Sequence, residues 1–119
     1  MTTYYYHPLP QLPASLLAYF NQNGYPLSLK KKYIVSLITD LQADADIELL
    51  VYKASSYSNS ISRSSIYLVL QWMVAHNLVL KTVYNDDSKI YYKVNTDKLG
   101  HINSGILVYA ADEQALISY

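Results

Sequence analysis

The chain has 119 residues, of which about half are hydrophobic, and it contains few glycines and prolines and no cysteine. This length and composition predict one packed domain. The lack of cysteine excludes disulfides, thiolate metal sites and thiol nucleophiles. Nine basic side chains balance nine acidic ones, so the chain has no overall basic excess, but every Lys and Arg lies between residues 30 and 98.

The first six residues contain neither the basic nor the apolar segment of a secretion signal, and no apolar run approaches the roughly 20 residues of a membrane span. We therefore expect a cytoplasmic protein with no membrane-spanning segment. His7, His76 and His101 are far apart in sequence, so we expect no bound metal and no cofactor. No nucleophile with a base, phosphate loop or convergent carboxylates is visible, so we expect no enzymatic activity.

The chain begins with an irregular arm over residues 1–12, because Pro8 and Pro10 each disfavour helix in the residue before them. A first helix is predicted to begin near Pro13. It ends before Gly24, a residue type that commonly follows the last turn of a helix.

Three further helices are predicted to follow residues that suit an N-cap, namely Ser28, Asp46 and Ser62. Each has apolar residues at three- and four-residue spacing, which indicates one buried face. The last of these helices runs to Asn77, which we expect to take the left-handed conformation that ends it.

Two segments rich in Val, Ile, Thr and Tyr, residues 78–84 and 89–95, flank the turn-forming sequence Asn-Asp-Asp-Ser and predict a β-hairpin. Residues 99–119 are expected to form a short β tail, with a terminal helix as the alternative. The predicted fold class is α+β. Over residues 13–98 we expect a winged helix, with a body of three to four helices and a hairpin wing, followed by the tail. Apolar runs in the tail favour a homodimer.

Four short motifs carry a resemblance to a known family. The segment ISRSSIYLVL at residues 61–70 is followed by NLV at 77–79 and DSKIYY at 87–92. These resemble the ferric uptake regulator family, whose recognition helix opens with I-S-x-A-T-V-Y-R-x-L and ends in G-L-V, and whose wing contains D-G-K-x-x-Y. The segment GYPLSLKK at 24–31 is similar to the family's G-L-R-x-T-x-Q-R. The resemblance covers roughly residues 16–94.

The resemblance implies a transcriptional regulator that binds double-stranded DNA as a dimer, with the helix of residues 62–77 as the recognition helix of a helix-turn-helix. Tyr67 matches the family's recognition-helix tyrosine, and Ser64 and Ser65 match its Ala-Thr pair. A tyrosine ring suits contact with a thymine methyl, and lysines suit phosphate. The expected base contacts are Arg63, Ser64, Ser65 and Tyr67, and the expected phosphate contacts are Lys30, Lys31, Gln71, Lys89 and Lys93.

The chain departs from the family pattern at several positions. Leu68 and Pro26 stand where the family has arginines, Ser88 replaces the wing glycine, and Lys31 keeps a charge without the bidentate fork of arginine. The family's usual metal ligands are also missing, so metal sensing is not expected. The balanced charge, Leu68 and Pro26 favour an alternative function, a winged-helix module for protein interaction or dimerisation that no longer binds DNA.

Overall fold

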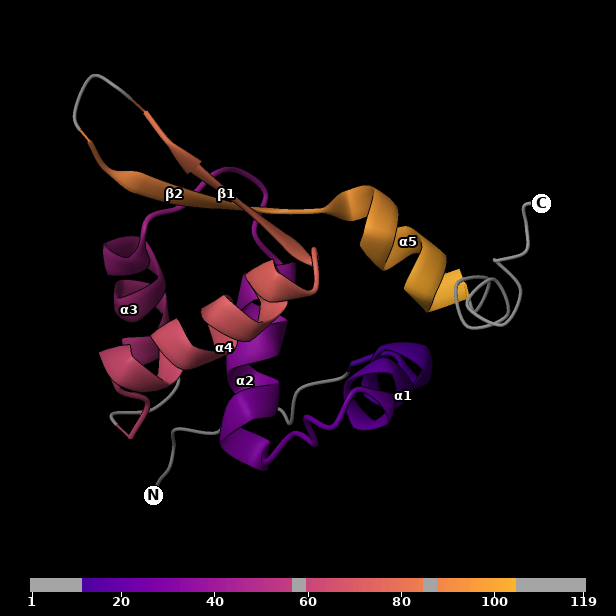
Figure 1. Ribbon diagram of the computed structural model, residues 1–119. Helices are drawn as coiled ribbons and strands as arrows, with labels where there is room; N and C mark the ends of the chain where they lie inside the picture. The colour runs from indigo at the N-terminus through magenta and orange to yellow at the C-terminus, as the bar shows by residue number, and fades with distance from the viewer. Residues whose placement is uncertain (1–11, 57–59, 85–87, 105–119) are drawn as a thin grey trace.

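The computed structural model describes residues 12–56, 60–84 and 88–104, and in these ranges it contains five helices and one two-stranded sheet. The elements follow one another as α1 (Ala14–Gln22), α2 (Leu29–Thr39), α3 (Ile47–Ser55), α4 (Arg63–Ala75), β1 (Val79–Val83), β2 (Ile90–Val94) and α5 (Thr96–Ser104). A helical body followed by a hairpin confirms the predicted α+β class and the winged-helix arrangement (Figure 1).

Three helices begin at the predicted caps. The side chains of Ser28, Asp46 and Ser62 accept hydrogen bonds from backbone amides three residues ahead, in the first turns of α2, α3 and α4. Such bonds satisfy amides that have no partner within the helix. Asn77 follows α4 with a φ of 61°, as predicted, and the chain turns there into the hairpin.

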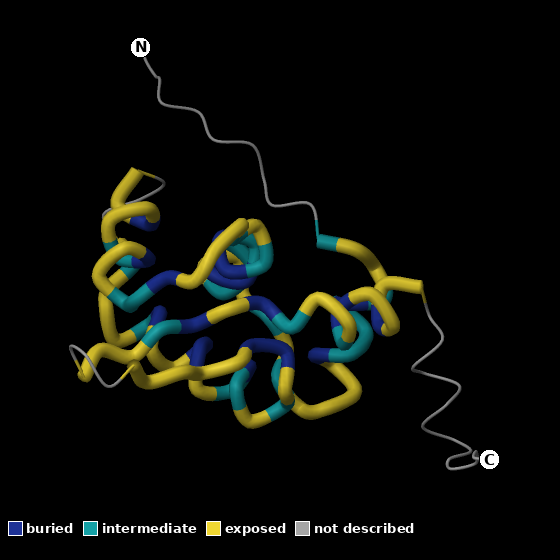
Figure 2. The backbone as a smooth tube through the Cα atoms, turned by 90° about the horizontal axis from the view of Figure 1, so that it is seen from above, coloured by how far each residue is buried: buried dark blue, intermediate teal, exposed yellow. Residues whose placement is uncertain are grey.

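The core lies where α4 crosses the other helices. Four side chains of α4 are buried against Leu16 and Phe20 of α1 and the apolar face of α2. The buried residues form a continuous interior in Figure 2, with exposed residues around it. This packing fixes the rotation of α4 about its axis. Its buried residues are Ile66, Val69, Leu70 and Met73.

The hairpin pairs β1 with β2 in antiparallel register, with Lys81 opposite Tyr92. A third segment joins the sheet edge, because Ala45 and Tyr92 exchange two backbone hydrogen bonds of 2.9 and 2.7 Å. The chain just before α3 is therefore attached to the wing. Tyr92 is buried while its neighbour Lys93 is exposed, as expected for alternating strand residues.

The predicted β tail is wrong for residues 99–104, which belong to α5. The amide of Lys98 donates to the Asn95 side chain at 3.2 Å, in the manner of an N-cap, and Leu99 and Ile102 are buried. α5 packs against α1 at the end of the molecule opposite α3 (Figure 1). The apolar runs of the tail, residues 106–110 and 115–119, lie outside the described residues, as does most of the N-terminal arm.

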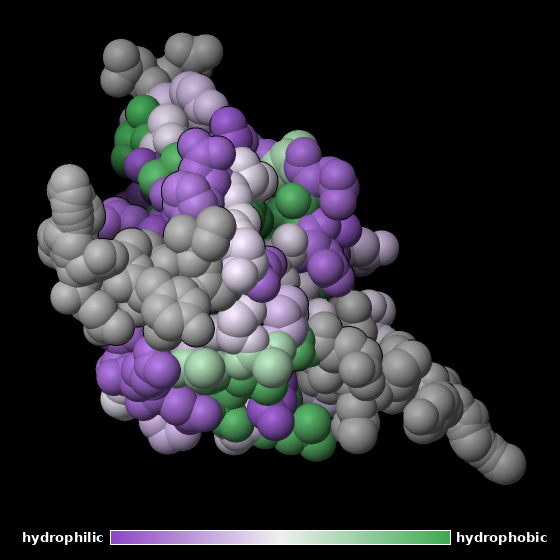
Figure 3. Space-filling model, turned by 90° about the vertical axis from the view of Figure 1, so that its right-hand side faces the viewer, coloured by the Kyte–Doolittle hydropathy of each residue, from purple (hydrophilic) through white to green (hydrophobic). Residues whose placement is uncertain are grey.

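The face that carries α1 and α5 shows hydrophilic side chains next to smaller groups of hydrophobic ones (Figure 3). No helix among the described residues is both long and apolar enough to cross a membrane.

Candidate nucleic-acid interface

The outward face of α4 carries four of the predicted contact residues. Because Ile66, Leu70 and Met73 point into the core, Ser64 and Gln71, which lie about half a turn away on the helix, must face outward. Tyr67 lies about a quarter turn from Ile66 and is 42% exposed, and Arg63 is exposed in the first turn of the helix. The predicted recognition surface is therefore open. Its members are Arg63, Ser64, Tyr67 and Gln71.

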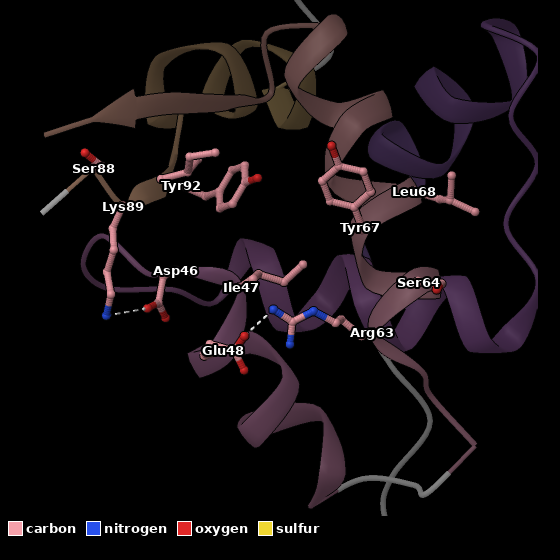
Figure 4. Close-up of a pocket in the computed structure, with 11 residues that line it drawn as sticks. Asp46, Ile47, Glu48, Arg63, Ser64, Tyr67, Leu68, Ser88, Lys89 and Tyr92 are labelled. Atoms are coloured by element: carbon pink, nitrogen blue, oxygen red, sulfur yellow. Dashed lines mark hydrogen bonds and ion pairs between the residues drawn. The ribbon is translucent and has the colours of Figure 1, made fainter.

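Two hollows flank α4. The wing-side hollow, about 700 Å³, lies between α4, the start of α3 and β2 (Figure 4). The α2-side hollow, about 950 Å³, lies between α4 and the start of α2. The exposed side chain of Leu68 lines both. Of the predicted contacts, the wing-side hollow brings together Arg63, Ser64, Tyr67 and Lys89, the α2-side hollow brings together Lys30, Lys31, Ser65 and Gln71, and Lys93 lines neither.

Both cations of the wing-side hollow are paired with acids of α3. Arg63 forms an ion pair with Glu48, and the ammonium of Lys89 lies 3.5 Å from a carboxylate oxygen of Asp46 (Figure 4). We call Arg63 and Lys89 the wing-side cations, and Asp46 and Glu48 the acidic pair. The attachment of Ala45 to β2 holds the acidic pair beside the wing. The charges in this hollow are therefore balanced.

The pKa values of the acidic pair reflect these contacts. The pKa of Asp46 lies below its ordinary value chiefly because its carboxylate accepts the Leu49 amide, with Lys89 contributing further. The hydrogen bond from Arg63 lowers the pKa of Glu48 and raises that of Arg63 itself. Both carboxylates therefore stay ionised at neutral pH.

The acidic pair should make the domain less stable in acid. A carboxylate whose pKa is lower in the folded state than in the unfolded state stabilises the fold when it is ionised. This contribution is complete when the pH is above the ordinary pKa, which is 3.8 for Asp46 and 4.5 for Glu48. It is lost as the pH falls through the lower pKa of the folded state. The free energy of unfolding, measured with urea, should therefore fall as the pH is lowered from about 6 to about 3. Asp46→Asn should reduce this fall, and an unchanged profile would contradict the contribution of Asp46.

The walls of the wing-side hollow are largely apolar. The side chains of Tyr67, Tyr92 and Ile47 lie around it (Figure 4), and Ile90 also lines it. Tyr92 is 5% exposed, and this burial raises the pKa of its hydroxyl. Tyr67 thus presents an apolar ring and a hydroxyl group at an open surface. Such a side chain suits contact with a base methyl or a sugar-phosphate edge.

The α2-side hollow differs in charge, because its lining includes no acidic side chain. The ammonium of Lys31 lies 4.3 Å from the ring centroid of Tyr25, which in turn stacks on Trp72. Lys30 is exposed beside it. Both lysines lie in the first turn of α2, where the helix macrodipole favours an anion over a cation. This hollow is the better match for phosphate.

Ser65 has a structural role in addition to its predicted contact. Its hydroxyl lies 3.0 Å from that of Ser62, and its amide donates to the same oxygen at 3.1 Å. The side chain is half-buried at the start of α4. Ser64, the residue before it, is exposed, whereas Ser65 is half-buried.

Acids at the start of α3 contact the wing, which was not expected from the sequence. Asp46 was predicted as a helix cap, and Glu48 was given no role. Asp44 also contacts the wing, where it accepts a hydrogen bond of 2.9 Å from Tyr84. One feature of the sequence could have indicated these contacts. Asp44, Asp46 and Glu48 alternate along the chain where α3 begins, and in a winged helix this segment passes the wing.

In the described part of the chain, the histidines are not part of a metal-binding cluster. Within this part of the chain, no three side chains of His, Cys, Asp or Glu come close enough to hold a metal ion. His76 stacks on Trp72, with ring centroids 3.8 Å apart. His101 lies exposed on α5.

Comparison with known proteins supports the fold. No protein-family model and no curated protein matches the chain. Among solved structures, the chain is similar to PerR from Streptococcus pyogenes, described for its peroxide sensing and gene regulation, with a TM-score of 0.62 and 18% sequence identity. The similarity covers 74% of this chain and 62% of the PerR chain, so this chain spans less than two thirds of PerR. At this level of identity, the similarity establishes the winged-helix fold.

Proposed function

We propose that the protein is a transcriptional regulator that binds duplex DNA, with α4 in the major groove. The observation that carries the proposal is the open polar face of α4 beside a hollow that contains Lys30 and Lys31 and no acid. The major groove of B-DNA, about 12 Å wide, admits an α-helix. The description of PerR as a gene regulator, on a similar fold, adds support.

In this proposal, Tyr67 and Ser64 approach base edges, while Lys30, Lys31 and Gln71 approach the phosphates on the α2 side. Contacts to phosphate position the protein, and contacts to base edges give sequence preference. We further propose that the protein binds DNA as a homodimer in the cytoplasm and has no catalytic activity. These last points rest on the sequence.

The test is the salt dependence of binding to a pool of random duplexes. Each phosphate contact by a cation contributes about 0.9 to the slope of log affinity against log salt concentration. Replacing Lys30 and Lys31 by Ala together should therefore reduce the slope by roughly 1.8. The measurement is fluorescence anisotropy over a range of salt concentrations.

A matched control removes the same charge elsewhere. Lys53 of α3 and Lys98 of α5 lie outside both hollows, so Lys53→Ala with Lys98→Ala should leave the slope nearly unchanged. Equal slopes for both double variants would contradict phosphate contact at the α2-side hollow.

A second candidate function is docking of a protein partner on the same face. The observation that favours it is the 60% exposure of Leu68, a large apolar side chain on the outward side of α4. An apolar side chain gains little against phosphates, whereas its burial in a protein interface removes apolar surface from water and is favourable. If no duplex is retained even at low salt, this second function replaces the first.

A further inference from the structure

The wing-side cations already have anionic partners, whereas no acid among the described residues forms an ion pair with Lys30 or Lys31 on the other side of α4. A DNA phosphate that approached Arg63 would have to displace the Glu48 carboxylate, and one that approached Lys89 would compete with Asp46. Such an exchange replaces one charge-assisted contact by another, so little binding energy is gained. The carboxylates also repel an approaching phosphate.

The geometry ties both acids to the wing. Asp46 caps α3 through its bond to the Leu49 amide at 3.0 Å, and the residue before it is hydrogen-bonded to Tyr92 of β2. Glu48 lies in the first turn of the same helix. The acids therefore face the wing-side hollow as part of the folded structure (Figure 4).

We propose that the acidic pair restrains duplex binding from the wing side by holding the wing-side cations away from phosphate. DNA affinity then comes mainly from the α2-side hollow, and the wing contributes contacts only when the acidic pair is neutralised. This inference rests on the proposed DNA-binding function. It identifies Asp46 and Glu48 as positioning residues that set affinity, and it predicts that the wing of this chain contacts phosphate weakly.

The ion pairs are exposed enough to be exchanged. Side-chain exposure is 55% for Arg63, 62% for Glu48 and 57% for Lys89, and Asp46 is less exposed at 21%. Exposed pairs of this kind contribute little to stability. Breaking them should thus change DNA affinity much more than folding.

The experiment compares the parent chain with a variant that carries both Asp46→Asn and Glu48→Gln. Asparagine caps a helix as well as aspartate does, so α3 should persist. The variant should bind random duplex about tenfold more tightly, and its salt slope should rise by roughly 0.9 to 1.8, because the carboxylates of Asp46 and Glu48 no longer compete with phosphate for Arg63 and Lys89. Binding is followed by anisotropy, and folding by circular dichroism.

A matched control separates this effect from net charge. Asp40→Asn with Asp97→Asn adds the same charge at the end of α2 and on α5, and it should raise the slope by much less. In addition, Arg63→Ala and Lys89→Ala should each change affinity less than about twofold in the parent and several-fold in the neutralised variant.

The outcomes distinguish this inference from the proposed function. If the parent binds duplex but the neutralised variant has the same affinity and slope, the restraint is wrong and DNA binding stands. An equal gain in the control also overturns the restraint, because net charge alone then explains it. If neither chain retains duplex at low salt, the proposed function fails and the inference fails with it.

Discussion

Phe20→Ala is expected to lower the free energy of unfolding by about 3–5 kcal/mol. Phe20 is fully buried, and its ring stacks on Trp72 with centroids 4.8 Å apart and an interplanar angle of 22°. Removing it leaves a cavity between α1 and α4 and deletes an aromatic contact. Since domains are stable by only about 5–15 kcal/mol, this loss is a large fraction of the total.

The measurement is the urea midpoint with a fixed slope, and the control is Tyr52→Ala on α3. Tyr52 is 75% exposed, so its removal should change stability by no more than about 0.5 kcal/mol. A loss below about 1 kcal/mol for Phe20→Ala would show that α1 does not share the core.

Features of the fold that depend on neighbouring residues were predicted correctly. The caps of α2, α3 and α4 are found at Ser28, Asp46 and Ser62, because a cap is a bond between residues three apart. The left-handed conformation of Asn77 just after α4 and the position of the hairpin are of the same kind. Side-chain periodicity also identified the outward face of α4 correctly, since the inward positions repeat every three or four residues.

The acidic pair could not be predicted in this way, because its contacts join distant parts of the chain. Fifteen residues separate Glu48 from Arg63, and 43 separate Asp46 from Lys89. The packing of α3 on α4 brings Glu48 to Arg63, and the attachment of Ala45 to β2 brings Asp46 to Lys89. In the sequence each charge is considered singly, so Arg63 was assigned to a base and Lys89 to phosphate without regard to the acids beside them.

α5 was given only as the alternative to the predicted β tail, for a related reason. Gly100 lies within this helix, and glycine weakens a helix by about 1 kcal/mol relative to alanine. The packing of Leu99 and Ile102 in the core outweighs this preference. The partner of α5 is α1, some 80 residues earlier in the chain, so the local sequence carried little sign of it.

Tyr67→Ala is expected to weaken binding to a preferred duplex by about 1–3 kcal/mol and to leave binding to random duplex nearly unchanged. The reason is the position of the ring, which lies open on α4 where a helix in the major groove meets base edges. The preferred duplex is first selected from a random pool with the parent chain. Affinities for both duplexes are then measured at one salt concentration.

Two further variants distinguish contact with a base from contact with the DNA backbone. Tyr67→Phe keeps the ring and removes the hydroxyl, so retained preference in this variant would assign the readout to contact with a methyl group. Lys30→Ala should weaken both duplexes alike, because phosphate carries no sequence information. If Tyr67→Ala also weakened both duplexes alike, Tyr67 would be a backbone contact, and the sequence preference of α4 would have to come from its other exposed side chains.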